Sequence, residues 1–89
     1  MYEIIFSPRA RREIGKLTSV IQDRLHDAVD GLGVNPRQVG VKRLTRMLYR
    51  LRVGDWRIIY AIIDKEHHVV VVKITRRSKE TYTDLDKLF

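Results

Sequence analysis

The feature that most constrains the fold is a two-residue turn signal between two stretches with the pattern of β-strands. Between Leu48 and Val53, apolar residues alternate with arginines, and Gly54-Asp55 follows directly. A period of two is typical of a strand with one buried face, and glycine in the first central position favours a type II′ hairpin turn. Residues 56–63 are rich in β-branched and aromatic side chains. We therefore predict a hairpin in which Val53 pairs with Trp56.

The predicted hairpin sorts its side chains onto two faces. The apolar face is expected to pack in the core and consists of Tyr49, Leu51, Val53, Trp56, Ile58 and Tyr60. The other face has Arg52 opposite Arg57, with Arg50 beside them. Like charges on neighbouring strands destabilise a sheet, so this arrangement suggests that an anion binds between them, and guanidinium groups bind phosphate through two parallel hydrogen bonds. A solvated basic surface is the alternative interpretation.

The remaining sequence predicts two helices and further strands. In chain order we expect a strand over 1–6, helices that begin at Ser7-Pro8 and Thr18-Ser19, a connector over 37–46, a turn over 64–67, a strand over 68–74 and a short C-terminal helix or tail over 82–89. The second helix is expected to stop at Gly31 and Gly33. The predicted fold is a small α+β domain of order β-α-α-β-β-β-(α), with an antiparallel sheet packed against an N-terminal helical hairpin.

Length and charge limit the classes of function. The 89 residues are enough for one domain, 1–89, and a net charge of +7 favours a polyanion or an acidic protein as partner. The absence of cysteine excludes disulfides and a thiol nucleophile. We find no export signal and no apolar stretch of membrane-spanning length, and expect a cytoplasmic protein without membrane contact.

Three segments resemble the RelE/ParE toxin superfamily, and specifically its RelE branch. They are Asn35-Pro36-Arg37 through Leu44, Leu48 through Tyr60, and Arg76-Arg77-Ser78-Lys79-Glu80-Thr81-Tyr82. With the order of elements, the resemblance covers essentially the whole chain. It implies the toxin of a type II toxin–antitoxin system, an endoribonuclease that cleaves mRNA in the ribosomal A site. The 2′-hydroxyl of the substrate would attack the adjacent phosphate, and neither a metal nor another cofactor would be needed.

The resemblance also implies roles for individual residues. Arg57 would stabilise the charge of the transition state, with Arg52 on the neighbouring strand, and Arg76 or Arg77 would serve the leaving group. Tyr82 would stack on a base or transfer a proton. The family often has lysines where this chain has Arg50 and Arg52, and arginine stays protonated, so Tyr82 is the better candidate for the general base. As RNA-binding residues we predict Arg50, Lys42, Arg43, Arg46, Lys73 and Lys79.

The implied partners are the ribosome with its 16S rRNA, mRNA, and an acidic RelB-like antitoxin in a toxin–antitoxin hetero-oligomer. Two other functions remain open. One is a ParE-like inhibitor of DNA gyrase, which would not need the converging arginines, and the other is a non-catalytic basic module that binds nucleic acid. A nuclease site at His67 and His68 is disfavoured, because both fall at a predicted turn without a cluster of carboxylates.

Overall fold

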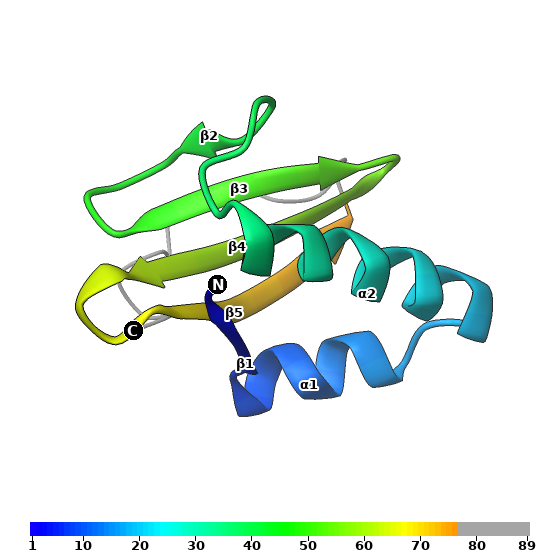
Figure 1. Ribbon diagram of the computed structural model, residues 1–89. Coiled ribbons are helices and arrows are strands. Elements are labelled where there is room, and N and C mark those ends of the chain that lie inside the picture. Colours follow the sequence, from blue (N-terminus) through cyan, green and yellow to red (C-terminus); the bar gives the residue numbers. More distant parts are fainter. Residues whose placement is uncertain (77–89) are drawn as a thin grey trace.

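The computed structural model describes residues 1–76, which form a sheet with two helices on one side (Figure 1). The elements are β1 (Glu3–Phe6), α1 (Pro8–Gly15), α2 (Ser19–Val34), β2 (Lys42–Arg43), β3 (Leu48–Val53), β4 (Trp56–Ile63), a 3-10 turn (Asp64–Glu66) and β5 (His68–Arg76). The α+β class is confirmed, and so is the order of the predicted strands and helices from β1 to β5. The helix or tail expected over 82–89 lies outside the described residues.

The sheet differs from the prediction in two details. Its strand order is β1-β5-β4-β3-β2, and β1 runs parallel to β5, so the sheet is mixed and not wholly antiparallel. Strand alternation does not encode direction, and no tight turn joins these two strands, whereas the turns at 54–55 and 64–67 force their neighbours to be antiparallel. The second difference is β2, a two-residue edge strand inside the predicted connector, which pairs with β3.

Both helices begin at the predicted caps, but α2 ends later than expected. The side chains of Ser7 and Thr18 accept hydrogen bonds from the backbone of the first helical turns. The helix α2 continues through Gly33 to Val34. A Cβ atom at Gly33 would lie 3.1 Å from the Tyr2 carbonyl oxygen, and the Tyr2 N–H donates to the Gly33 carbonyl at 2.7 Å. This glycine therefore lets the chain before β1 approach the helix and does not stop it.

The predicted hairpin is confirmed in turn type and register. Val53 pairs with Trp56 and Arg52 with Arg57. Gly54 has a φ of 60°, whereas Asp55 keeps a negative φ, as a type II′ turn requires. The hairpin thus divides its side chains between two faces as the alternation predicts.

We call the side of the sheet that α1 and α2 cover the helix face. The main core lies there and includes Leu25 of α2 and Ile58 and Tyr60 of β4, none of which exposes any surface. A second, smaller apolar cluster lies on the other side of the sheet and consists of Leu48, Ile59, Ala61 and Val72. Neither helix described here is long and apolar enough to span a membrane.

Candidate functional site

The side of the sheet opposite the helices carries the candidate site, and we call it the basic face. Directly paired residues of neighbouring strands point to the same side of a sheet. Lys42 of β2 pairs with Arg50, Arg50 pairs with Ile59, and Ile59 pairs with Lys73 of β5. These four residues form one row across four strands, which we call the inner row. The outer row, nearer the Gly54 turn, consists of Arg52, Arg57 and Thr75.

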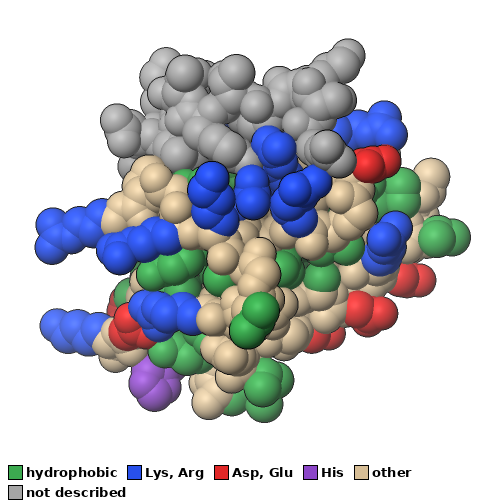
Figure 2. Space-filling model, turned by 90° about the horizontal axis from the view of Figure 1, so that it is seen from above, with side chains coloured by type: hydrophobic (Ala, Val, Ile, Leu, Met, Phe, Trp, Pro, Cys, Tyr) green, Lys and Arg blue, Asp and Glu red, His purple; other side chains and the backbone are tan. Residues whose placement is uncertain are grey.

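The two rows place like charges directly opposite one another. Arg52 faces Arg57, and Lys42 faces Arg50. Like charges directly opposite one another are unfavourable in a sheet. Figure 2 shows Lys and Arg side chains gathered on the side of the molecule where β2 and β3 lie. This accumulation of cations on paired strands is the arrangement expected of a surface that binds a polyanion.

Burial differs between the arginines of the basic face. Arg52 is exposed, whereas Arg50 and Arg57 are half-buried. The Nε atom of Arg50 is fully buried and has no hydrogen-bond partner among the described residues. An unsatisfied buried donor costs on the order of 1–3 kcal/mol, so an acceptor supplied by a ligand would be favoured there.

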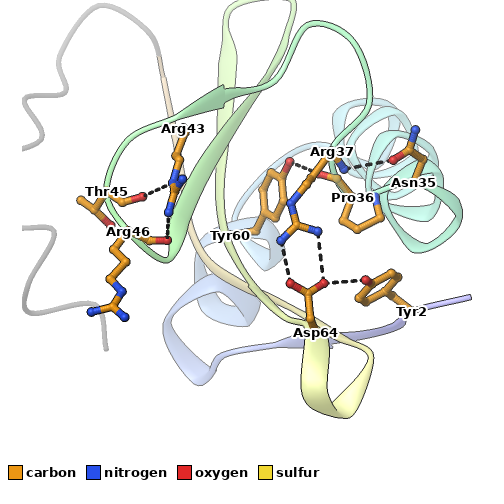
Figure 3. A network of polar contacts seen from close by, with 9 residues as sticks. All are labelled: Tyr2, Asn35, Pro36, Arg37, Arg43, Thr45, Arg46, Tyr60 and Asp64. Atoms are coloured by element: carbon orange, nitrogen blue, oxygen red, sulfur yellow. Dashed lines mark hydrogen bonds and ion pairs between the residues drawn. The ribbon is translucent and has the colours of Figure 1, made fainter.

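Three other predicted site residues lie away from these rows. Arg76 pairs with Trp56, and its guanidinium lies 5.5 Å from the centre of that ring, which places it on the helix face. Arg43 pairs with Tyr49, a residue of the helix-face core, and donates to the carbonyl oxygens of Thr45 and Arg46. The exposed Arg46 side chain points away from this network (Figure 3). Arg77, Lys79 and Tyr82 lie outside the described residues.

A polar network at the far end of the sheet has no counterpart in the prediction. Arg37 donates two hydrogen bonds to Asp64, at 3.1 and 2.7 Å, and the Tyr2 hydroxyl donates to the same carboxylate at 2.6 Å (Figure 3). The Arg37 guanidinium also lies 5.7 Å from the centre of the Tyr49 ring. These contacts fasten the segment that leads into β2 to the β4–β5 turn. All three residues of the network lie outside the alternating stretches, so periodicity gives no signal for them.

Two tyrosines connect this network to the core. The rings of Tyr49 and Tyr60 stack with centres 5.8 Å apart, and the buried Tyr60 hydroxyl donates to the Pro36 carbonyl at 2.6 Å. Burial raises the pKa of the Tyr60 hydroxyl, so this hydroxyl remains a donor throughout the physiological range. Tyr60 is therefore a structural residue that holds the loop after α2.

The network predicts a measurable pH dependence. The hydrogen bonds from Arg37 and Tyr2 lower the pKa of Asp64 from 3.8 to about 2. A lowered carboxyl pKa stabilises the fold fully above the unfolded-state value and loses that contribution as pH falls toward the folded-state value. We expect Asp64→Asn to lower stability at neutral pH, and the difference from wild type to shrink between about pH 4 and 2. Urea unfolding across this range tests the expectation, and an NMR titration that gave Asp64 an ordinary pKa would contradict it.

The paired histidines lie at the junction of the β4–β5 turn and β5. His67 ends the predicted turn in a left-handed conformation, and its ring lies 5.2 Å from the Tyr2 ring. His68 begins β5, and its Nε2 lies 3.4 Å from a Glu3 carboxylate oxygen. In the part of the chain that the structure describes, no group of three or more His, Asp or Glu side chains is placed to hold a metal ion.

Comparison with known proteins identifies the family. Residues 4–81 match the model of the ParE toxin of the type II toxin–antitoxin system, parDE. The chain is 32% identical over 80 residues to Toxin RelE of Mycobacterium tuberculosis, a match that covers 86% of this chain and 82% of the relative.

Solved structures show the same fold. The isolated E. coli RelE toxin has a TM-score of 0.79 at 24% identity and covers 98% of this chain and 97% of its own. The RelBE2 toxin–antitoxin complex of Mycobacterium tuberculosis has a TM-score of 0.76 at 29% identity, over 85% of this chain and 98% of that chain. A family match along most of the sequence and a shared fold agree: the chain belongs to the RelE/ParE toxin superfamily of type II toxin–antitoxin systems, with RelE toxins among its relatives.

Proposed function

We propose that this toxin is a ribosome-dependent endoribonuclease that cleaves mRNA in the A site. The observation that carries the proposal is the outer row, where Arg52 and Arg57 face each other on paired strands beside the inner row of cations. A gyrase inhibitor that acts by protein contact has no need for two opposed guanidiniums on one sheet face. Cleavage of RNA does need such groups, because the phosphate gains negative charge during the reaction and guanidiniums stabilise it.

The proposed reaction is a transesterification within the message. A base removes the proton of the 2′-hydroxyl, its oxygen forms a bond to the adjacent phosphorus, and the bond to the 5′ oxygen breaks. That oxygen takes up a proton, so the products are a 2′,3′-cyclic phosphate and a 5′-hydroxyl. Arg57 and Arg52 stabilise the negative charge that builds up on the phosphate, and this lets the reaction proceed without a metal ion.

The two proton transfers need groups other than the described arginines. Arginine stays protonated at physiological pH and cannot act as a general base. We propose Tyr82 as base and assign Arg77 to the leaving-group side, since Arg76 lies on the helix face against Trp56. Dependence on the ribosome fits this assignment, because the ribosome would hold the 2′-hydroxyl in line with the phosphate.

Tyr82→Phe separates proton transfer from stacking. The phenylalanine ring keeps the aromatic surface and loses only the hydroxyl, so stacking on a base would survive. If Tyr82 is the base, single-turnover cleavage on programmed ribosomes should slow by about 100-fold or more. A phenylalanine variant that cleaves at the wild-type rate would remove Tyr82 from the chemistry.

A second candidate is inhibition of DNA gyrase, because the matching family model is that of the ParE toxin. Induced expression followed by mapping of mRNA 5′ ends distinguishes the candidates. Codon-phased cuts in translated messages support the nuclease, whereas DNA breaks without mRNA cuts support gyrase inhibition. Binding of nucleic acid with neither kind of damage would leave a non-catalytic basic module.

We also propose that an acidic, RelB-like antitoxin covers the basic face in a hetero-oligomer. Support comes from the net charge of +7 and from the RelBE2 relative, which was solved as a toxin–antitoxin complex. Charge attraction speeds association and is screened by salt. The association rate should therefore fall by about tenfold or more between low and physiological ionic strength. An association rate that does not change with salt would rule out charge as the basis of recognition.

A further inference from the structure

We infer that the basic face contains two phosphate subsites, one on each row, and that Lys73 binds the phosphate next to the one that is cleaved. The inference rests on the proposed nuclease function. It assigns the scissile phosphate to the outer row with Arg57, and the neighbouring phosphate to the inner row with Arg50 and Lys73.

The spacing of the rows fits consecutive phosphates. Arg50 and Arg52 are two residues apart on β3, and Arg57 and Ile59 are two residues apart on β4. Two residues of a strand span about 6.5–7 Å, which is similar to the distance between neighbouring phosphates of an extended RNA strand. An RNA segment that runs along β3 and β4 therefore presents one phosphate to each row.

A β-bulge is what places Lys73 on the basic face. Ile59 pairs with Lys73 but Tyr60 pairs with Val71, so Val72 is the extra residue in β5. The side chain of Val72 lies in the apolar cluster of the basic face, and strict alternation would then turn Lys73 toward the helices. The bulge lets both residues face the same side, and bulges commonly redirect a side chain in this way.

The helix α1 and its N-cap residue Ser7 hold the backbone on both sides of Lys73. The Ser7 hydroxyl donates to the Val72 carbonyl at 3.3 Å, and a Glu13 carboxylate oxygen accepts from the Ile74 N–H at 2.9 Å. Glu13 is half-buried, and its other oxygen lies 3.4 Å from the Arg9 Nε. The bulge is therefore anchored by hydrogen bonds from Ser7 and to Glu13, and Glu13 acts as a positioning residue for Lys73.

The donor pattern of the inner row points to an anion. The buried Nε of Arg50 has no acceptor in the described structure, and Lys42 lies directly opposite Arg50. Two cations directly opposite each other repel, and the buried Nε of Arg50 lacks an acceptor. A bound phosphate would offset the positive charges and accept a hydrogen bond from this Nε. Lys73 enters the same row from the other side, across Ile59.

The test combines Lys73→Met with neutralised phosphates in the message. Single-turnover cleavage is measured on programmed ribosomes with a natural message and with messages that carry one uncharged methylphosphonate beside the cut. On the natural message we expect Lys73→Met to slow cleavage on the order of tenfold. On the message neutralised at the adjacent phosphate, wild type should slow similarly and Lys73→Met should cause no further loss.

A matched control removes the same charge elsewhere. Lys65→Met changes a lysine on the exposed turn between β4 and β5 and should leave the rate unchanged on every message. If wild type cleaves but the Lys73→Met loss persists on every neutralised message, the second subsite is wrong while the nuclease function stands. If the wild-type protein does not cleave the natural message, the nuclease function and the second subsite are both wrong.

The positioning role of Glu13 has its own test. Glutamine keeps a side-chain oxygen that can accept from the Ile74 N–H, so Glu13→Gln should cleave at nearly the wild-type rate. Glu13→Ala should match the Lys73→Met loss on the natural message and add little to it in the double variant. Independent losses that multiply in the double variant would show that Glu13 does not act through Lys73.

Discussion

Arg57→Ala is expected to slow mRNA cleavage on programmed ribosomes by about 100- to 1,000-fold while the protein stays folded. Arg57 is half-buried on the central strand β4 and lies opposite Arg52, and this partial burial limits the orientations open to its side chain before the substrate arrives. A charge that is already oriented needs no reorganisation as the phosphate gains negative charge. Removing the Arg57 charge therefore raises the free energy of the transition state more than that of the bound substrate, and cleavage slows.

Stability should change far less than activity. Relief of the Arg52–Arg57 repulsion offsets the loss of the other contacts of Arg57, so the free energy of unfolding is expected to stay within about 1 kcal/mol of the wild-type value. Urea unfolding followed by circular dichroism measures this change. Arg11→Ala, on the exposed side of α1, removes one charge away from the sheet and should leave the cleavage rate unchanged. A folded Arg57→Ala protein with the wild-type cleavage rate would show that the outer row is not the site of cleavage.

The hairpin could be predicted from sequence because its information is local. The alternation from Leu48 to Val53 and the glycine at position 54 define the faces, the turn and the register together, and each agrees with the structure. A shift of one residue would expose Leu51 and Ile58 and bury arginines, so no neighbouring register competes. The opposition of Arg52 and Arg57 follows directly from that local pattern.

The features that sequence could not supply have no local pattern that marks them. The parallel pairing of β1 with β5 and the placement of Lys42 opposite Arg50 involve no turn signal. The bulge that turns Lys73 has no residue type that marks it, because Val72 and Val71 are both ordinary strand residues. Arg76 illustrates the limit most clearly, since only the register of β5 shows that it lies against Trp56 and away from the other site arginines.

A substitution on the helix face is expected to lower stability and to leave activity unchanged. Leu25 of α2 is completely buried against the helix face, on the other side of the sheet from the basic rows. Leu25→Ala removes buried methyl groups and leaves a cavity, so it should lower the free energy of unfolding by about 2–5 kcal/mol. That is a large part of the 5–15 kcal/mol typical of a domain of this kind.

The cleavage rate of folded Leu25→Ala protein should nevertheless equal that of wild type. The helix α2 lies on the side of the sheet opposite the basic face. The positions of the cations are determined by the registers of β3, β4 and β5, and these registers do not depend on the Leu25 side chain. Val20→Ala is the matched control on the same helix, because Val20 is 75% exposed and its truncation should change stability by no more than about 0.5 kcal/mol. Urea unfolding and single-turnover cleavage below the unfolding transition test both properties in the same samples. A cleavage rate that falls together with stability would show that the helix face takes part in arranging the site.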